Sequence, residues 1–185
     1  MGEQKPQKPG PAPWQVPVAV EDVTEAGAHF DLSADAGVRA AIAAEAGLRD
    51  LPRLEAHFDV ARREPGGLHV TGVVVATVGQ NCVVTLEPLS NEVEETVDLL
   101  FMPQGAAARP AAGTEAKPHD AKWDDPEPLI GGGVDLGALA TEFLILGLNP
   151  YPRKPGAVFD PPAEEEPETG PFGALAKLTK GQDVR

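Results

Sequence analysis

Apolar and polar residues alternate most regularly in the stretch LEAHFDVAR, residues 54–62. A period of two places successive side chains on opposite faces of a β-strand, so we expect one buried and one solvated face. The positions expected to be buried are Leu54, Ala56, Phe58 and Val60. A turn with Pro-Gly-Gly then leads into LHVTGVVVATV, residues 68–78, which is apolar on both faces. Such a strand is typical of the centre of a sheet or of a sheet covered by a helix.

The chain is expected to turn again at residues 79–81 and to continue into CVVTLEPL, with Cys82 at the start of a strand. Residues 92–102 alternate once more, and their expected core positions are Val93, Val97, Leu99 and Phe101. Successive strands joined by short turns are antiparallel, because parallel neighbours need a long crossover. The centre of the chain is therefore predicted to be a β-meander.

Shorter elements precede the meander. The segments WQVPVAV and AHFDLS, residues 14–20 and 28–33, have the composition of short strands. A helix is expected over residues 35–46, with Ser33 capping its start and Gly47 placed to end it.

A second helix is expected over residues 136–148, with Asp135 as its cap and Asn149-Pro150 as its stop. The apolar side chains of this helix leave little polar surface near its end, so it must pack on the sheet or on a partner. We therefore predict an α+β fold, in which two helices cover one face of a twisted antiparallel sheet of about five to seven strands.

Glycine and proline, with 20 residues each among 185, concentrate outside the periodic segments. This distribution predicts a folded centre between irregular ends. We expect a flexible Pro-rich lead (1–13), an α+β domain (14–159) interrupted by a mobile loop (104–128), and a disordered tail (160–185). The tail contains an acidic linker and a short amphipathic motif.

The net charge of −14, from 29 Asp and Glu against 15 Lys and Arg, disfavours strong sequence-independent binding of nucleic acid. A basic protein is the partner that this charge favours. No stretch has the length and apolarity of a signal peptide or membrane span, and a single cysteine excludes an internal disulfide. We expect a cytoplasmic protein without a membrane partner.

Candidate catalytic and metal-binding residues are few. His57 and His69 are expected on the polar faces of adjacent strands, where they could approach each other, but surface histidines on strands are common. His29 and His119 lie near turns and suggest no further role. Cys82 has no neighbouring base, and the nearby glutamates, Glu87 above all, are expected to raise the pKa of its thiol. We therefore expect no enzyme activity, no metal, no cofactor and no small-molecule substrate.

The C-terminal motif PFGALAKLTKG carries an apolar stripe beside two lysines. The stripe consists of Phe172, Leu175, Ala176 and Leu178. Two interpretations stay open: a helical docking motif for a partner, or a terminal helix that folds back on its own sheet.

Four stretches together resemble the YceD family, the large ribosomal RNA subunit accumulation proteins. They are LPRLEAHFDVAR, VTGVVVATVGQNCVVTLEPLSNEVEETVDLLFMP, DDPEPLIGGGVDLGALATEFLILGLNPYPRKPG and FGALAKL. They occur in the family's order and cover most of residues 50–160 plus the tail. The most specific parts are the family motif Cys82, Thr85, Leu86, Glu87 and Pro88, the Asp-rich run before Asp135, and LNPYPRKPG.

This resemblance implies a bacterial protein, similar to the alphaproteobacterial branch, that is needed for synthesis, processing or stability of 23S ribosomal RNA. Many relatives carry a second cysteine where this chain has Thr85, and some carry more cysteines near the C-terminus. If those relatives hold zinc, this chain cannot, because too few ligands remain. We expect Cys82 to be a packed residue and the motif to act as a surface element.

The function expected from resemblance and charge together is that of a non-catalytic adaptor for a basic ribosomal protein or an rRNA-processing factor. The residues predicted to contact this partner are Glu92, Glu94, Glu95, Asp98, Asp124, Asp125, Phe172, Leu175 and Leu178. The alternative is direct contact with rRNA through a local basic patch, for which the candidates are Arg62, Arg63, Arg153 and Lys154.

Overall fold

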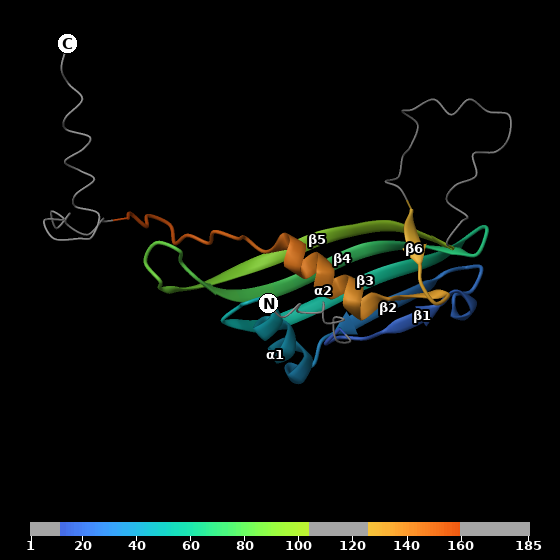
Figure 1. The fold of residues 1–185 in the computed structure, drawn as a ribbon, viewed down its shortest axis with the longest axis horizontal. Coiled ribbons are helices and arrows are strands. Elements are labelled where there is room, and N and C mark those ends of the chain that lie inside the picture. The colour runs from blue at the N-terminus through green and yellow to red at the C-terminus, as the bar shows by residue number, and fades with distance from the viewer. Residues whose placement is uncertain (1–11, 104–125, 160–185) are drawn as a thin grey trace, which may run out of the picture.

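The computed structural model describes residues 12–103 and 126–159, and the fold is α+β. A five-stranded sheet and a small two-stranded sheet form the β-structure, and two helices pack on the larger sheet (Figure 1). The elements are β1 (Pro17–Ala19), a 3-10 turn (Val20–Asp22), β2 (Ala28–Ser33), α1 (Ala36–Glu45), β3 (Asp50–Arg63), β4 (Gly67–Asn81), β5 (Pro88–Pro103), β6 (Glu127–Leu129), β7 (Gly133–Asp135) and α2 (Leu136–Gly147).

The large sheet has the strand order β2-β3-β4-β5-β6. The first four strands are antiparallel neighbours in chain order, which confirms the predicted meander and the central place of β4. The sheet is nevertheless mixed, because β6 pairs with β5 in parallel. Residues 104–126 lie between these two strands, and a connection of that length permits the crossover that a parallel pair requires.

Alternation along β3 is as the sequence predicts. Leu54, Ala56, Phe58 and Val60 are at most 1% exposed. They form one hydrophobic core with the inward residues of β4 and β5 and with Ile42 of α1. The buried residues of α2 belong to the same core, so both helices cover the same face of the sheet, as predicted.

The start of α1 differs from the prediction. Its cap is Asp35, whose Oδ1 accepts a hydrogen bond from the backbone N–H of Val38 at 2.8 Å. Ser33 is instead the last residue of β2 and pairs with Glu55. Gly47 follows the helix with a φ of +65°, the left-handed conformation that glycine adopts without steric cost.

Helix α2 begins at a cap that also joins distant parts of the chain. Asp135 Oδ1 accepts hydrogen bonds from the backbone N–H groups of Gly137, at 3.0 Å, and Ala138, at 3.1 Å. The same oxygen accepts one from Val16 N–H at 2.8 Å, just before β1. Asp135 is the predicted cap, and its third bond fastens the N-terminal strand to the helix.

Two predicted irregular segments are shorter or displaced. Strand β4 continues through residues 79–81, and the turn falls at residues 82–87, so Cys82 follows a strand instead of starting one. Residues 127 and 128, predicted as part of the mobile loop, belong to β6. No helix among the described residues is long and apolar enough to cross a membrane.

Candidate interaction site on the open face of the sheet

The face of the large sheet opposite the helices is covered by no other element among the described residues. We call it the open face. The strand register places the following residues on it: His29, Asp31, Ser33, Arg53, Glu55, His57, Asp59, Arg63, His69, Thr71, Val73, Val75, Thr77, Glu92, Glu94, Thr96 and Asp98. Six carboxylates stand here against two arginines and three histidines, so the face is acidic when the histidines are neutral.

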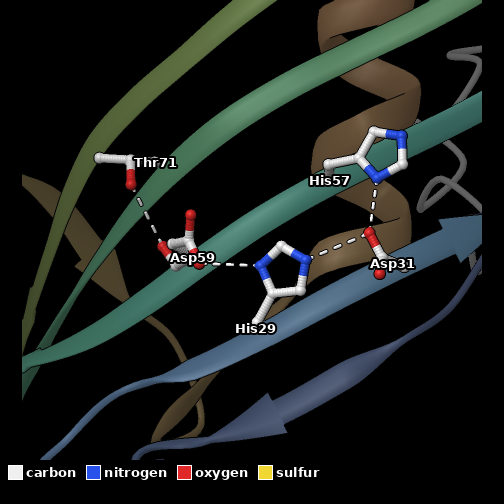
Figure 2. Close-up of polar contacts among 5 residues, drawn as sticks. All are labelled: His29, Asp31, His57, Asp59 and Thr71. Atoms are coloured by element: carbon white, nitrogen blue, oxygen red, sulfur yellow. Dashed lines mark hydrogen bonds and ion pairs between the residues drawn. The ribbon is translucent and has the colours of Figure 1, made fainter.

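Histidines and aspartates alternate across β2 and β3 (Figure 2). Nδ1 of His29 lies 2.8 Å from Oδ1 of Asp59, and its Nε2 lies 3.2 Å from Oδ1 of Asp31. His57 Nδ1 approaches the same oxygen of Asp31 at 2.6 Å. The chain Asp59–His29–Asp31–His57 therefore continues across two strands, and Thr71 on β4 donates its hydroxyl to the carbonyl oxygen of Asp59 at 3.4 Å.

The position of His29 between two carboxylates favours its charged form. An imidazolium carries an N–H on both ring nitrogens and can donate to both aspartates, whereas neutral imidazole can donate to only one. The hydrogen bond to Asp59, followed by the charge of Asp31, raises the pKa of His29 above 6.5. The hydrogen bond from His57 in turn lowers the pKa of Asp31. Protonation of His29 therefore depends on carboxylates from two strands, Asp31 on β2 and Asp59 on β3.

His69 and Asp98 form a second pair farther along the sheet. His69 Nε2 lies 2.7 Å from Asp98 Oδ1, and Nδ1 lies 3.2 Å from a guanidinium nitrogen of Arg63. A tautomer with its proton on Nε2 satisfies both contacts. His57 pairs with Val73, four positions from His69, so the two histidines are about 13 Å apart. The prediction that His57 and His69 could approach each other is therefore wrong.

The other end of the open face carries the glutamates. Arg53 lies 3.0 Å from Glu92 and 3.6 Å from Glu55, and Thr77 donates its hydroxyl to Glu92 at 2.8 Å. Glu94 has no hydrogen bond or ion pair with the described residues and is exposed. Its carboxylate is therefore available to a cation.

Half-buried valines occupy the middle of the open face. The register places Val75 in one row with Glu55 on β3 and Glu94 on β5. Val73 lies in the next row, between His57 and Thr96. Directly opposed residues of antiparallel strands project from the same face, so the two valines form an apolar strip that has carboxylates on both sides at Val75.

The residues predicted to contact a partner do not all lie on this face. Glu92, Glu94 and Asp98 do, whereas Glu95 projects from the face that carries the helices. A methyl group built on Gly147 of α2 would lie 2.6 Å from Cγ of Glu95, which shows how closely the helix crosses it. The remaining candidates lie outside the described residues: Asp124, Asp125, Phe172, Leu175 and Leu178.

The four cationic candidates for RNA contact fall at two ends of the sheet. Arg62 and Arg63 end β3, beside the start of β4, and Arg62 donates to the carbonyl oxygen of Glu21 at 3.0 Å. Arg153 and Lys154 follow α2 and lie beside the turn after β4, where Lys154 contacts Cys82. The 14 steps of chain from Leu68 to Cys82 span roughly 45 Å, so these residues form no single patch.

Cys82 is the anchor of the turn at residues 82–87. Its sulfur accepts hydrogen bonds at 3.4 Å from the backbone N–H groups of Val84, Thr85 and Lys154. The side chain is fully buried, as expected. These donors, that of Lys154 first, lower the pKa of the thiol to about 6. The expected rise is therefore wrong, because N–H donors of the distant Lys154 and of the turn itself stabilise the thiolate.

The rest of the family motif completes this turn. Lys154 Nζ lies 2.9 Å from Glu87 Oε2, so the glutamate expected to repel a thiolate is itself neutralised. Thr85 donates its hydroxyl to Glu87 at 3.1 Å, and Leu86 is 77% exposed with a φ of +60°. Pro88 begins β5. The turn is thus fastened to the segment after α2, which includes the buried Pro152.

In the part of the chain that the structure describes, no group of three or more His, Cys, Asp or Glu side chains could hold a metal ion. The acidic and imidazole groups instead pair with one another along the strands. Sequence patterns missed the involvement of His29, because its partner on the neighbouring strand, Asp59, is 30 residues away. The alternation in AHFDLS carried the only available signal, since it places His29 and Asp31 on one face.

Comparison with known proteins identifies a family for this chain. The family model described as large ribosomal RNA subunit accumulation protein YceD matches residues 70–179, more than half of the chain. It begins within β4 and includes β5, α2 and the Cys82 turn. No curated protein and no solved structure matches the chain.

Proposed function

The chain belongs to the YceD family, which is associated with accumulation of large-subunit ribosomal RNA, and from this premise we propose that it is a non-catalytic ribosome-biogenesis factor. It supports the synthesis, processing or stability of 23S rRNA by binding a basic protein, either a ribosomal protein or an rRNA-processing factor.

The observation that carries this proposal is the acidic open face. A face without a covering element, on which carboxylates outnumber arginines, presents a negative potential to its surroundings. Complementary potentials attract a cationic protein and repel like-charged partners. Ribosomal assembly brings such proteins together with rRNA, and an acidic surface can hold their cationic groups until rRNA phosphates replace it.

Direct binding of rRNA is the alternative, and the open face does not favour it. Single-stranded RNA is bound by stacking of bases on aromatic side chains and by cations that neutralise phosphates. None of the strand residues on this face is Phe, Tyr or Trp. Among the cationic candidates, Lys154 is already paired with Glu87, and Arg62 donates to the backbone carbonyl oxygen of Glu21.

The experiment that tests the proposal is a binding assay with defined partners. Tagged full-length protein is incubated with purified large-subunit ribosomal proteins, with and without rRNA, and half of each sample is treated with RNase before capture. An adaptor retains one or a few basic proteins after RNase treatment. Loss of every bound protein with the RNA would overturn the proposal.

The same samples decide between the two modes of binding. Affinity for rRNA alone, falling by roughly one unit of log K per unit of log salt for each phosphate contact, would support the alternative. Arg153→Ala combined with Lys154→Ala would then weaken that binding, whereas the adaptor proposal predicts no effect of these changes on protein capture.

A further inference from the structure

The row Glu55–Val75–Glu94 crosses three neighbouring strands of the open face. Strands lie about 4.8 Å apart, so the two carboxylates stand roughly 10 Å from each other with an apolar side chain at the midpoint. Glu94 makes no pair with the described residues, and the only partner of Glu55 is Arg53 at 3.6 Å. Most other carboxylates on the face are engaged at shorter distances by histidine, arginine or threonine.

An α-helix presents groups with this spacing. Seven residues rise about 10.5 Å and return to nearly the same side of the helix, while the third and fourth residues between them project from that side. A cation, an apolar pair and a second cation in this order therefore match Glu55, the strip of Val73 and Val75, and Glu94. The helix axis would run across the strands, along the row.

We propose that the open face binds an amphipathic basic helix of a protein partner, with two Arg or Lys side chains seven positions apart on Glu55 and Glu94 and apolar residues on Val73 and Val75. This inference rests on the proposed function and adds the chemistry and orientation of the partner. Arginine suits the outer positions best, because its guanidinium pairs with a carboxylate through two N–H groups.

The probe is a synthetic Ala-rich helical peptide of about 14 residues, or four turns, with Arg at positions i and i+7 and Leu at i+3 and i+4. A control peptide of identical composition carries the second Arg at i+9, on the opposite side of the helix. Fluorescence anisotropy measures the affinity of each labelled peptide for the full-length protein. We expect the matched peptide to bind about tenfold more tightly, since only it reaches both carboxylates.

Variants of the protein identify the surface. Glu94→Lys should weaken binding of the matched peptide by about tenfold or more, because it replaces an attraction to the peptide's arginine with a repulsion. Val75→Thr keeps the shape of the strand residue and should weaken binding severalfold by removing apolar contact. Glu25→Lys makes the same charge change at an exposed turn before β2, outside the row Glu55–Val75–Glu94, and should have little effect. Circular dichroism and urea unfolding confirm that each variant folds.

Equal affinity of the two peptides, or of Glu94→Lys and Glu25→Lys proteins for the matched peptide, would overturn the inference. If RNase-resistant capture of a basic protein persists in Glu94→Lys, the adaptor function stands and its surface lies elsewhere. If no basic protein is captured by the unmodified chain, the proposed function itself fails. If a single-stranded RNA probe binds more tightly than the matched peptide, and Arg153→Ala combined with Lys154→Ala abolishes this binding, the chain is an RNA-binding protein.

Discussion

Nδ1 of His29 on β2 lies 2.8 Å from Oδ1 of Asp59, its directly opposed neighbour on β3. The contact is exposed to solvent, yet it joins two strands through a group that titrates near neutral pH. The second ring nitrogen of His29 contacts Asp31, so the imidazolium bridges two carboxylates.

Replacement of Asp59 by Asn is expected to lower the pKa of His29, because Asp59 makes the largest contribution to its rise above 6.5. A group with a raised pKa in the folded state contributes stability below its unfolded pKa and loses this contribution as pH rises through the folded value. The contribution of His29 to the unfolding free energy should therefore fall as pH rises above about 6.5. NMR titration of the His29 ring, assigned with His29→Gln, measures the pKa. An unchanged midpoint in the variant would show that Asp59 is not the cause.

Titration of Cys82 is expected to have its midpoint near 6 in the folded protein, well below the ordinary 9.0 of a thiol. The depressed pKa stabilises the fold fully above about pH 9, and this stabilisation is lost as pH falls toward 6. Cys82→Ser should remove that part of the pH dependence. Ultraviolet absorbance of the thiolate and urea unfolding at several pH values measure both effects.

Burial supplies a second test of the same residue. Iodoacetamide should modify native Cys82 slowly despite its thiolate character, since the side chain is 0% exposed, and quickly after unfolding. Rapid modification of the folded chain would contradict the anchoring of the turn.

Asp135→Ala is expected to destabilise the protein more than Asp35→Ala. Either loss removes a helix cap, typically worth about 1 kcal/mol. Asp135 also accepts a bond from Val16 N–H, so its removal frees the attachment of β1 as well. We predict a loss of about 1 kcal/mol for Asp35→Ala and about 2 kcal/mol for Asp135→Ala by urea unfolding. Asp135→Asn, which keeps an acceptor oxygen, should recover most of the difference.

Gly72→Ala is expected to destabilise the sheet by about 1–3 kcal/mol, because the added methyl group overpacks it. It would meet the carbonyl oxygen of His57 and would lie 2.8 Å from Cδ1 of Phe58. Gly37→Ala in α1 is the matched substitution, since the added methyl group would contact only a side-chain oxygen, Oδ1 of Asp35, at 3.3 Å. That change should stabilise the helix by up to about 1 kcal/mol. Destabilisation of equal size by both would contradict the packing of β4 on β3.

Local patterns predicted those parts of the fold in which each residue's environment depends on its near neighbours. Alternation in residues 54–60 identified the buried face of β3 correctly, because burial repeats every second residue in any half-covered strand. The same information was insufficient at Ser33 and Asp35, which both have cap-forming side chains. Pairing of Ser33 with Glu55 extends β2 and moves the helix cap by two residues, from Ser33 to Asp35.

The candidate sites depended on contacts that sequence spacing does not contain. Lys154 N–H reaches the sulfur of Cys82 across 72 residues, and this contact reverses the expected direction of the thiol pKa. Likewise, parity along β5 places Glu95 with the core residues Val93 and Val97, but the sequence does not show that α2 crosses this position. The acidic character of the surface was predictable from net charge, whereas its division between two faces was not.

Strand β6 pairs with only the last three residues of β5, from Phe101 to Pro103. Along the rest of β5, the outer row of backbone N–H and C=O groups has no strand beside it in the described part of the chain. A bare edge of this kind invites another β-strand, and a second copy of the molecule would be the nearest candidate. Antiparallel pairing of two β5 edges would bring Glu92 and Glu94 of one copy close to the same two glutamates of the other. Repulsion between these carboxylates disfavours such pairing, so the charges proposed to attract a basic partner would also oppose self-association.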